Sequence, residues 1–425
     1  SYATAGVSFG DFFKVNKRTS WGYGVKALVN LTETKADVLL QEAYLKGKFG
    51  IFELQAGRKK QIQGLGDSTL SSGSYIWSGN ALPMPMINLV VNDYWAPKFI
   101  NGVVGFKGNY AHGWFENQRS DVADFYLHQK SFYGRLGKPN WLFKFYGGFN
   151  HQVQWGGTLK YADPYNIAAR NGKIVTGLKE YIYMITGQSM NVVGGDTATY
   201  GVNDGWNRLG NHLGSVDIGM EIDWKKAKVF FYRQSIYEDG SLYYGNNITD
   251  GLHGIAFTRK ADQGILKLVV EYFNATSQGG SGGAGNIGIL RGQDNYQNNS
   301  VYRDGWTYMG HGIGTPLMTL DSETDLSPGN AVYFDNSRVE TFYVAASGKW
   351  GENEILIRGS LSNAIGSYGN EYTNALKQVS VGVQWQRPVQ LMGYDAHLKA
   401  SLGADKGLWK PDVIGGNVSL VLPLN

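Results

Sequence analysis

The feature that most constrains the fold is a strict alternation of apolar and polar residues that recurs along the chain. In residues 215–224 every even position is Val, Ile, Met or Trp, while the odd positions carry Ser, Asp, Gly or Glu. Residues 141–154, 378–386 and 394–404 follow the same pattern. Successive side chains of a strand point to opposite faces of the sheet. Each segment is therefore predicted to be a strand with one apolar and one polar face.

The alternation alone also fits a soluble β-sandwich, and three further features separate the two folds. The segments are long compared with the strands of globular proteins, whose usual length is about 5–6 residues. Trp, Tyr and Phe concentrate near the segment ends, as in the aromatic girdles of membrane barrels. Short and long connections alternate, which is typical of outer-membrane barrels. We therefore predict an all-β fold, a transmembrane antiparallel outer-membrane β-barrel.

We predict about seventeen strands in a single barrel domain that covers residues 1–425. The predicted strands span residues 5–15, 20–32, 36–47, 50–58, 86–97, 101–114, 124–136, 140–152, 212–224, 226–238, 252–260, 263–275, 338–349, 353–363, 374–387, 394–405 and 413–423. Single-chain bacterial barrels usually have an even number of strands, so we expect roughly 16–18. Eighteen would need one more strand before Ser1, which is not Met and indicates a processed or trimmed chain.

The long connections are predicted to lie at the extracellular end and to occlude the lumen. The longest are residues 58–86, 153–211 and 276–337, which we expect to form plug or extracellular elements. Residues 364–373 are predicted to be a further loop at this end. Apolar residues recur at helical spacing within 176–190, which predicts a short helix there.

Composition excludes several other classes of protein. The absence of Cys rules out disulfides and thiolate metal sites. A net charge of +4 is too small to indicate nucleic acid binding, and no apolar run is long enough for a transmembrane helix. None of the seven His forms a close metal-ligand pair, and no GxSxG elbow is present. We therefore predict a non-enzymatic protein without a metal or cofactor.

The densest local signal is the segment 57–85, which is rich in Gly, Ser and Asn and ends in Pro-x-Pro. We expect it to fold into the lumen and to line or plug the barrel, as such loops do in large barrels. An ordinary surface loop is the alternative interpretation. The residues singled out here as polysaccharide-binding or lumen-lining are Arg58, Lys59, Asp67, Tyr75, Trp77 and Asn80.

Basic and aromatic residues of the hairpin at 124–157 form a second candidate set. Lys130, Arg135 and Lys144 are expected in the lumen, where they could attract an acidic polymer, and Trp155 ends the hairpin. A hydrated barrel wall that pairs its own charges explains the same residues. Trp206 is one of many aromatics in the long loops. These aromatics either stack on sugar rings or simply order the loops, and the sequence does not separate the two interpretations.

Three short segments resemble the Wzi capsule-assembly family. They are Gly66-Asp67-Ser68-Thr69-Leu70, Ser78-Gly79-Asn80-Ala81-Leu82-Pro83-Met84-Pro85 and Trp155-Gly156-Gly157. The resemblance is specific over about residues 57–157, and it implies an outer-membrane β-barrel that holds capsular polysaccharide at the cell surface. Better-known members carry a periplasmic helical region before an eighteen-stranded barrel, and no helical pattern precedes the first predicted strand here.

Three functions remain open at this point. The first is a lectin-like protein of the bacterial outer membrane that anchors or organises capsular polysaccharide or exopolysaccharide. The second is a diffusion channel or saccharide-specific porin. The third is a structural subunit of an envelope or secretion complex. The expected partners are outer-membrane lipid, a surface polysaccharide and other envelope proteins, with no nucleic acid.

Overall fold

The computed structural model describes residues 3–10, 17–31, 35–119, 121–238, 245–281, 292–324, 333–391 and 393–422. Within these residues, seventeen strands form one antiparallel sheet in which neighbours in the chain are neighbours in space. The strands are β1 (Ala3–Gly10), β2 (Thr19–Leu31), β3 (Ala36–Phe49), β4 (Phe52–Arg58), β5 (Pro85–Trp95), β6 (Val104–Trp114), β8 (Tyr126–Leu136), β9 (Phe143–Trp155), β11 (Asn211–Asp223), β12 (Ala227–Glu238), β13 (Gly251–Arg259), β14 (Gly264–Asn274), β17 (Arg338–Trp350), β18 (Asn353–Ser367), β19 (Asn370–Leu391), β20 (Tyr394–Gly407) and β21 (Val413–Val421).

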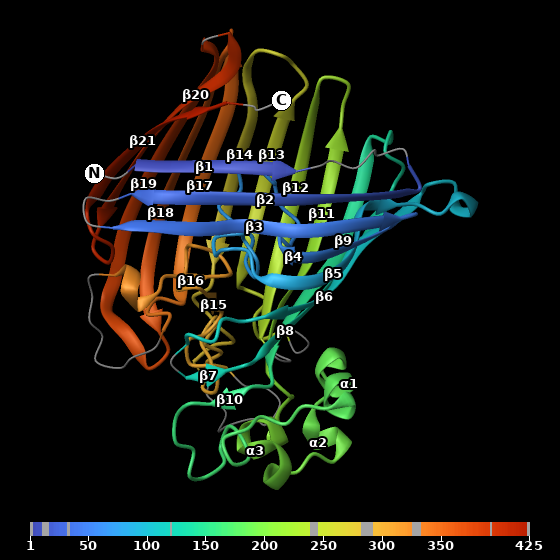
Figure 1. Cartoon of the computed structure of the whole chain (residues 1–425), viewed down its shortest axis with the longest axis vertical. Coiled ribbons are helices and arrows are strands. Elements are labelled where there is room, and N and C mark those ends of the chain that lie inside the picture. Colours follow the sequence, from blue (N-terminus) through green and yellow to red (C-terminus); the bar gives the residue numbers. More distant parts are fainter. Residues whose placement is uncertain are drawn as a thin grey trace.

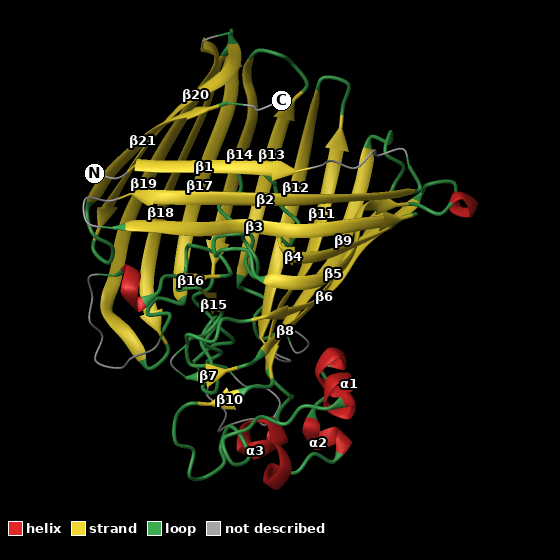
Figure 2. Cartoon of the chain, viewed as in Figure 1, coloured by secondary structure: helices red, strands yellow, loops and turns green. Residues whose placement is uncertain are grey.

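The sheet curls so that β1–β4 face β12–β17 across an interior that loops occupy (Figure 1, Figure 2). Among the described residues, ladders join each strand to the next from β1 to β21, and none joins β21 to β1. Each of the seventeen strands matches one predicted segment, with ends that differ by a few residues. The prediction of an antiparallel barrel-type sheet is confirmed.

The two faces of the sheet differ in polarity as the alternation predicts. On β11, Ser215 and Asp217 are fully buried and point inward, whereas Val216 and Ile218 are 42% and 60% exposed and point outward. Six exposed tryptophans lie within two residues of a strand end: Trp21, Trp95, Trp114, Trp141, Trp224 and Trp350. An outward apolar band flanked by aromatic residues is the lipid-facing surface of an outer-membrane barrel.

The two ends of the sheet differ in the length of their connections. At the short-turn end, β3–β4, β11–β12 and β17–β18 are joined by two or three residues each. The opposite, long-loop end carries residues 59–84, 115–125 and 156–210. In outer-membrane barrels short turns face the periplasm and long loops face the outside, which gives the chain its orientation.

Helices occur mainly in the connection between β9 and β11. They are α1 (Leu178–Thr186), α2 (Met190–Val193) and α3 (Thr197–Trp206), and Figure 1 shows them together beyond the ends of β8 and β9. The helix predicted within 176–190 is confirmed as α1. Two single-turn 3-10 helices lie at Lys98–Ile100 and Asp321–Glu323. Within the described residues, no helix is long and apolar enough to cross a membrane.

The loop predicted at 364–373 is wrong. β18 continues to Ser367 and β19 begins at Asn370, so only Tyr368 and Gly369 form the turn. Gly369 has a φ of 77°, in the left-handed region that a tight turn requires. The polar residues that suggested a loop instead extend both strands beyond their neighbours.

Short strand pairs order the remaining loops. β7 (Val122–Ala123) pairs with β10 (Thr158–Leu159), and β15 (Thr307–Tyr308) pairs with β16 (His311–Gly312). The first pair joins the connection before β8 to the connection after β9. Segments far apart in the chain are therefore fixed to one another at the long-loop end.

Candidate functional site

Residues 59–84, which we call the inner loop, run through the interior and bond to the wall on several strands. The backbone N–H of Leu65 donates to Asp217 Oδ2 on β11 at 2.9 Å. The N–H of Ser72 donates to Glu271 Oε2 on β14 at 2.6 Å. Both wall carboxylates are at most 1% exposed. Because these side chains belong to inward faces of the sheet, the inner loop lies inside the barrel wall.

Apolar side chains explain why a loop rich in Gly and Ser has one conformation. Leu70, Tyr75, Ile76 and Trp77 are at most 5% exposed and belong to the main core. The ring of Tyr75 lies 6.3 Å from that of Phe273 on β14, measured between centroids. Burial of such side chains stabilises a folded segment by about 1.5–3 kcal/mol each. The inner loop is therefore anchored by apolar contacts as well as by hydrogen bonds.

The segment 292–324, which we call the cap segment, covers the inner loop. The N–H of Thr315 donates to the carbonyl of Tyr75 at 2.9 Å, and the N–H of Ser78 donates to the carbonyl of Ile313 at 3.1 Å. Aromatic side chains of the cap segment are at most 4% exposed: Tyr296, Tyr302, Trp306 and Tyr308. The inner loop and the cap segment therefore form one packed unit, and this unit fills the interior near the long-loop end.

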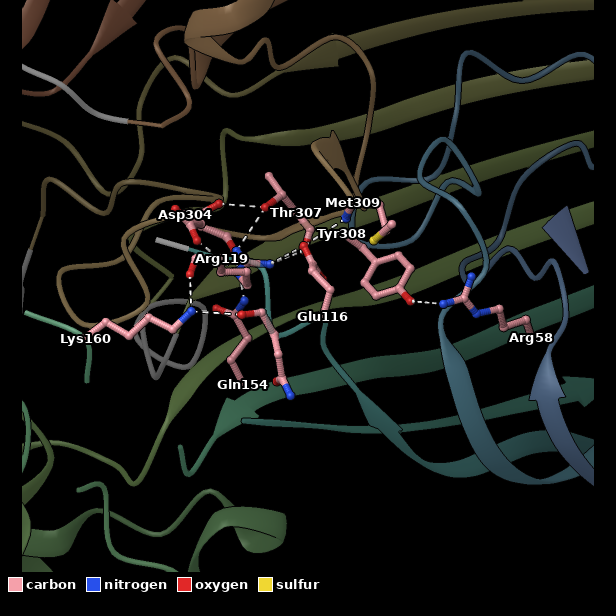
Figure 3. Close-up of polar contacts among 11 residues, drawn as sticks. Arg58, Glu116, Arg119, Gln154, Lys160, Asp304, Thr307, Tyr308 and Met309 are labelled. Carbon is pink, nitrogen blue, oxygen red and sulfur yellow. Dashed lines mark hydrogen bonds and ion pairs between the residues drawn. The ribbon is translucent and has the colours of Figure 1, made fainter. Parts of the chain in front are cut away.

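Arg119 joins the cap segment to the connection before β8 (Figure 3). Its guanidinium donates to Asp304 Oδ2 at 3.0 Å and to the carbonyls of Thr307 and Gly305 at 2.8 and 3.1 Å. The side chain is buried, so these partners replace water almost completely. Gln154 of β9 also donates to the Gly305 carbonyl, at 2.9 Å.

Two carboxyl groups of these loops have shifted pKa values. Burial acts to raise the pKa of Asp67, but its ion pair with Lys267 and the hydrogen bonds from Thr69 and Leu70 outweigh burial and hold the pKa below its usual range. Burial raises the pKa of Glu116, despite the nearby guanidinium of Arg119. The lowered pKa favours the charged carboxylate of Asp67. Its Oδ1 accepts hydrogen bonds from the backbone N–H groups of Thr69 and Leu70, and these bonds close a tight turn.

The predicted residues of the inner loop and its start have structural contacts. Arg58 donates to the hydroxyl of Tyr308 at 3.1 Å, and Lys59 lies 3.9 Å from Glu53. Tyr75 and Trp77 are core residues. Asn80 is exposed and donates to the carbonyl of Gly312 at 3.2 Å. Five of the six thus hold the inner loop or its neighbours in place, and Lys59 alone lines a large interior cavity.

The three cations predicted in the lumen do not lie together. Lys144 is buried near the short-turn end, where it pairs with Glu221 and Asp223 at 2.7 and 3.0 Å. Arg135 points inward beside Tyr94. The lumenal placement of Lys130 is wrong, because residues five apart on a strand point to opposite faces. Lys130 lies on the outward face and donates to the carbonyl of Ile185 in α1.

The two predicted tryptophans have different environments. Trp155, at the end of β9, packs against Tyr126 and Tyr181 with ring centroids 5.6 and 5.8 Å apart. Gly157, two residues after Trp155, has a φ of 105°, and a Cβ at this position would lie 2.8 Å from the carbonyl oxygen of Ala123. Trp206, at the end of α3, is 62% exposed. The eleven predicted residues are therefore spread over the plug, both faces of the wall and the outer surface.

A cluster of histidines on the outward face was not predicted. The cluster consists of His112, His128, His151 and His212, from β6, β8, β9 and β11. His151 Nε2 lies 2.9 Å from His212 Nδ1, and the hydroxyl of Tyr181 in α1 lies 2.7 Å from His112 Nε2. Within the described residues, no three His, Asp or Glu side chains form a group that could hold a metal ion. Only the register of four strands brings these histidines together, so residue spacing in the sequence carried no signal.

These contacts show that α1 to α3 fold back against the outside of the wall. Val153 of β9 is fully buried with Met184 and Met190 of the helices. The long-loop end therefore has two different coverings. The inner loop and cap segment fill the interior, and the helices cover the outer face at the ends of β6 to β11.

An antiparallel sheet of seventeen strands with a lipid-facing apolar band, a polar interior and a loop-filled lumen defines the class of outer-membrane β-barrel proteins. The chain lies in the bacterial outer membrane. A family model for the capsule assembly protein Wzi matches residues 3–325. The chain belongs to the Wzi family of capsule assembly proteins, and the resemblance over about residues 57–157 is confirmed.

Several solved structures of low sequence identity are similar to the chain. Pseudomonas aeruginosa OpdL has 8% identity and a TM-score of 0.47, with 99% of this chain and 91% of OpdL covered. P. aeruginosa OccK5 (OpdH) has 8% identity and a TM-score of 0.46, with coverages of 99% and 94%. An anion-selective porin from Comamonas acidovorans has 8% identity and a TM-score of 0.37, with coverages of 99% and 87%. None of the curated proteins compared with the chain matches it.

Proposed function

We propose that the protein is a lectin-like anchor that binds surface polysaccharide at the long-loop end and retains it without chemical change. Membership of the Wzi family implies association with the outer membrane and with surface polysaccharide. The observation that carries the proposal is the packed unit of inner loop and cap segment, which fills the interior behind the outer surface. A polymer that meets this end finds a fixed surface rather than an open pore.

Exposed aromatic residues supply the contacts that a sugar polymer requires. Tyr165 is 80% exposed and Trp206 is 62% exposed. Nearby, the guanidinium of Arg303 lies 3.7 Å from the ring centroid of Tyr161, and Asn203 of α3 donates to Ser300 Oγ at 3.1 Å. Aromatic rings offer faces for the C–H groups of sugars, and the amide and guanidinium groups bind hydroxyls and carboxylates. Repeated weak contacts along a polymer add through multivalency.

The loop aromatics differ in exposure. Tyr200, Tyr296, Tyr302, Trp306 and Tyr308 are buried and order the loops. Tyr165 and Trp206 are exposed and remain available to a ligand. Only the second group supports the proposal.

The experiment compares surface retention and direct binding in the same variants. In a deletion strain, polysaccharide attached to washed cells falls and polysaccharide in the medium rises, with an unchanged total. The double variant Tyr165→Ala/Trp206→Ala reproduces this shift in part, and the purified protein binds isolated capsular polysaccharide about tenfold more weakly, or about 1.4 kcal/mol. Val192→Ala is the matched control, because Val192 is equally accessible on the same helical connection, with 84% exposure.

Three results would count against the anchor. An unchanged partition of polysaccharide in the deletion strain removes the retention role. A large steady conductance of the wild-type protein in planar bilayers supports the diffusion channel instead, because a filled interior conducts poorly. Co-purification with other envelope proteins at a fixed stoichiometry supports the structural subunit.

A further inference from the structure

A separate polar cavity lies inside the barrel on the short-turn side of the inner loop. Its volume is about 260 Å³, and it is bounded by the start of the inner loop and by β4, β5, β6 and β8. At ~30 Å³ for each water, this space holds about nine water molecules, on the scale of one sugar residue. Its lining includes Lys59, Lys60 and Lys107 and, among the described residues, no Asp or Glu. Glu53 supplies a carboxylate in contact with the lining, since it lies 3.9 Å from Lys59 and accepts from Gln55 and Asn92.

Two inward cations beside this cavity, Lys107 and Arg135, form no ion pair in the described part of the chain, although the charge of Asp93 acts on Lys107. Lys107 lies 5.1 Å and Arg135 lies 5.6 Å from the ring centroid of Tyr94, so both cations share one aromatic ring. Lys107 also lies 5.7 Å from the centroid of Tyr133, and the Nε of Arg135 is buried without a hydrogen-bond partner. Aromatic faces compensate a desolvated cation only in part. Two like charges beside one aromatic ring, offset only in part by Asp93, favour the binding of an anion.

Amide side chains form another part of the lining. Asn88 donates to Gln61 Oε1 at 3.3 Å, and Asn109 donates to Asn88 Oδ1 at 3.2 Å. Ser131 continues the row by donating to Asn109. Amides can donate and accept at once, which matches the hydroxyl groups of a sugar. The binding of a small inorganic anion does not require such a row of amide groups.

We infer that this cavity is a binding site for a carboxylated sugar of the uronic acid type, with Lys107, Lys59 and Arg135 directed to the carboxylate and the amide row to the hydroxyls. The site differs from the outer surface described above, because its lining residues belong to the start of the inner loop and to β4, β5, β6 and β8, and do not include Tyr165 or Trp206. The inference holds for an anchor and for a channel alike.

Titration calorimetry of the purified, folded protein in detergent tests the site with D-glucuronate and D-glucose as probes. We expect D-glucuronate to bind and D-glucose to bind at least tenfold more weakly. Lys107→Gln lowers the affinity for D-glucuronate at least tenfold. Lys399→Gln is the matched control and leaves the affinity unchanged, because Lys399 lines a different lumenal cavity near β18 to β21. A gel shift on heating shows that each variant is folded, and Lys59→Gln replaces Lys107→Gln if the latter does not fold.

Each alternative result of these titrations leads to a different conclusion about the site. Absence of D-glucuronate binding at millimolar concentration, or equal affinity for D-glucose, overturns the inference. Equal affinity for inorganic phosphate also overturns it, since the amide row would then contribute nothing. A polymer of glucuronate that binds more tightly than the monomer supports the site and identifies a polysaccharide chain as the source. Tyr165→Ala/Trp206→Ala leaves D-glucuronate binding unchanged, so failure at one site does not imply failure at the other.

Discussion

Asp217 on β11 accepts a hydrogen bond at 2.9 Å from the backbone N–H of Leu65, 152 residues earlier in the chain. The hydroxyl of Tyr133 donates to the same carboxylate oxygen at 2.8 Å. The carboxylate is fully buried, so the inner loop supplies part of the solvation that water would otherwise give. The wall therefore holds the inner loop through side chains of the wall and backbone groups of the loop. Changes in the wall can release the loop without altering its sequence.

Glu271→Ala should loosen the inner loop and raise the conductance. Glu271 accepts hydrogen bonds from Ser71 Oγ at 2.7 Å, Ser72 N at 2.6 Å and Tyr232 Oη at 2.6 Å. Bonds to a charged group contribute about 1.5–3 kcal/mol each, and the substitution leaves all three donors unpaired. We expect brief openings in planar bilayers that the wild-type protein lacks.

The control for this substitution is Glu340→Ala. Glu340 also accepts from a tyrosine hydroxyl, that of Tyr272 at 2.6 Å, but on the outward face of β14 and β17, opposite the inner loop. The conductance of the Glu340→Ala variant should equal that of the wild-type protein. Openings of equal frequency in both variants would show that Glu271 has no special role in closing the lumen.

The inner loop should also loosen at low pH because of Asp67. The ion pair with Lys267 and the hydrogen bonds of Asp67 hold its pKa below its usual range, although burial opposes this. A lowered folded-state pKa stabilises the fold above the unfolded value, which is about 3.9 for Asp. This stabilisation is lost as the pH falls below about 4 and through the lowered pKa.

Asp67→Asn provides the comparison. At neutral pH the variant should unfold at a lower urea concentration than the wild-type protein. Its free energy of unfolding should be lower by about 1–3 kcal/mol, because the charged contacts are lost. The two proteins should converge as the pH falls from 6 to 2.5, in urea titrations followed by tryptophan fluorescence. A difference that stays constant over this range would contradict a pH-dependent role for Asp67.

Arg119→Met should detach the cap segment from the connection before β8. The substitution removes the donors to Asp304, Thr307 and Gly305 (Figure 3), and it leaves a buried carboxylate without its guanidinium. Removing one partner of a buried ion pair costs about 3–5 kcal/mol. We expect rapid protease cleavage within residues 292–324 while the strands remain protected. Arg303→Met is the control, because Arg303 stacks on Tyr161 at the surface and should change the rate little.

The strands could be predicted from the sequence because each carries its own pattern. The run at 215–224 alternates without a break, and β11 extends from Asn211 to Asp223. The helix α3 was missed, since it includes Gly201 and Gly205, and glycine weakens a helix. Gly201 has non-helical dihedral angles at a kink within this element. Local patterns thus identify an element only where the local preference agrees with the fold.

The candidate site depends on contacts between distant residues, and these could not be predicted. Ser71 meets Glu271 across 200 residues of chain. The outward position of Lys130 follows from the register of β8 with β9, where Lys130 is opposite His151. A shift of one residue in register exchanges the faces of a strand. The sequence indicates that residues 58–86 are ordered, but only the fold shows which wall residues hold them.

Met184→Ala should detach the helical connection from the outer wall while the barrel stays intact. Met184 of α1 is fully buried against Val153 of β9 and Met190 of α2. A Met to Ala change in a packed core costs about 2–5 kcal/mol, and the other buried hydrophobic residues within the three helices are Met190 and Tyr200. Hydrogen exchange should therefore accelerate in residues 178–206 and remain slow in β9 and β11. Leu178→Ala is the control on the same helix, because Leu178 is exposed and its loss leaves no cavity. Equal acceleration by both substitutions would mean that α1 does not depend on its contact with the wall.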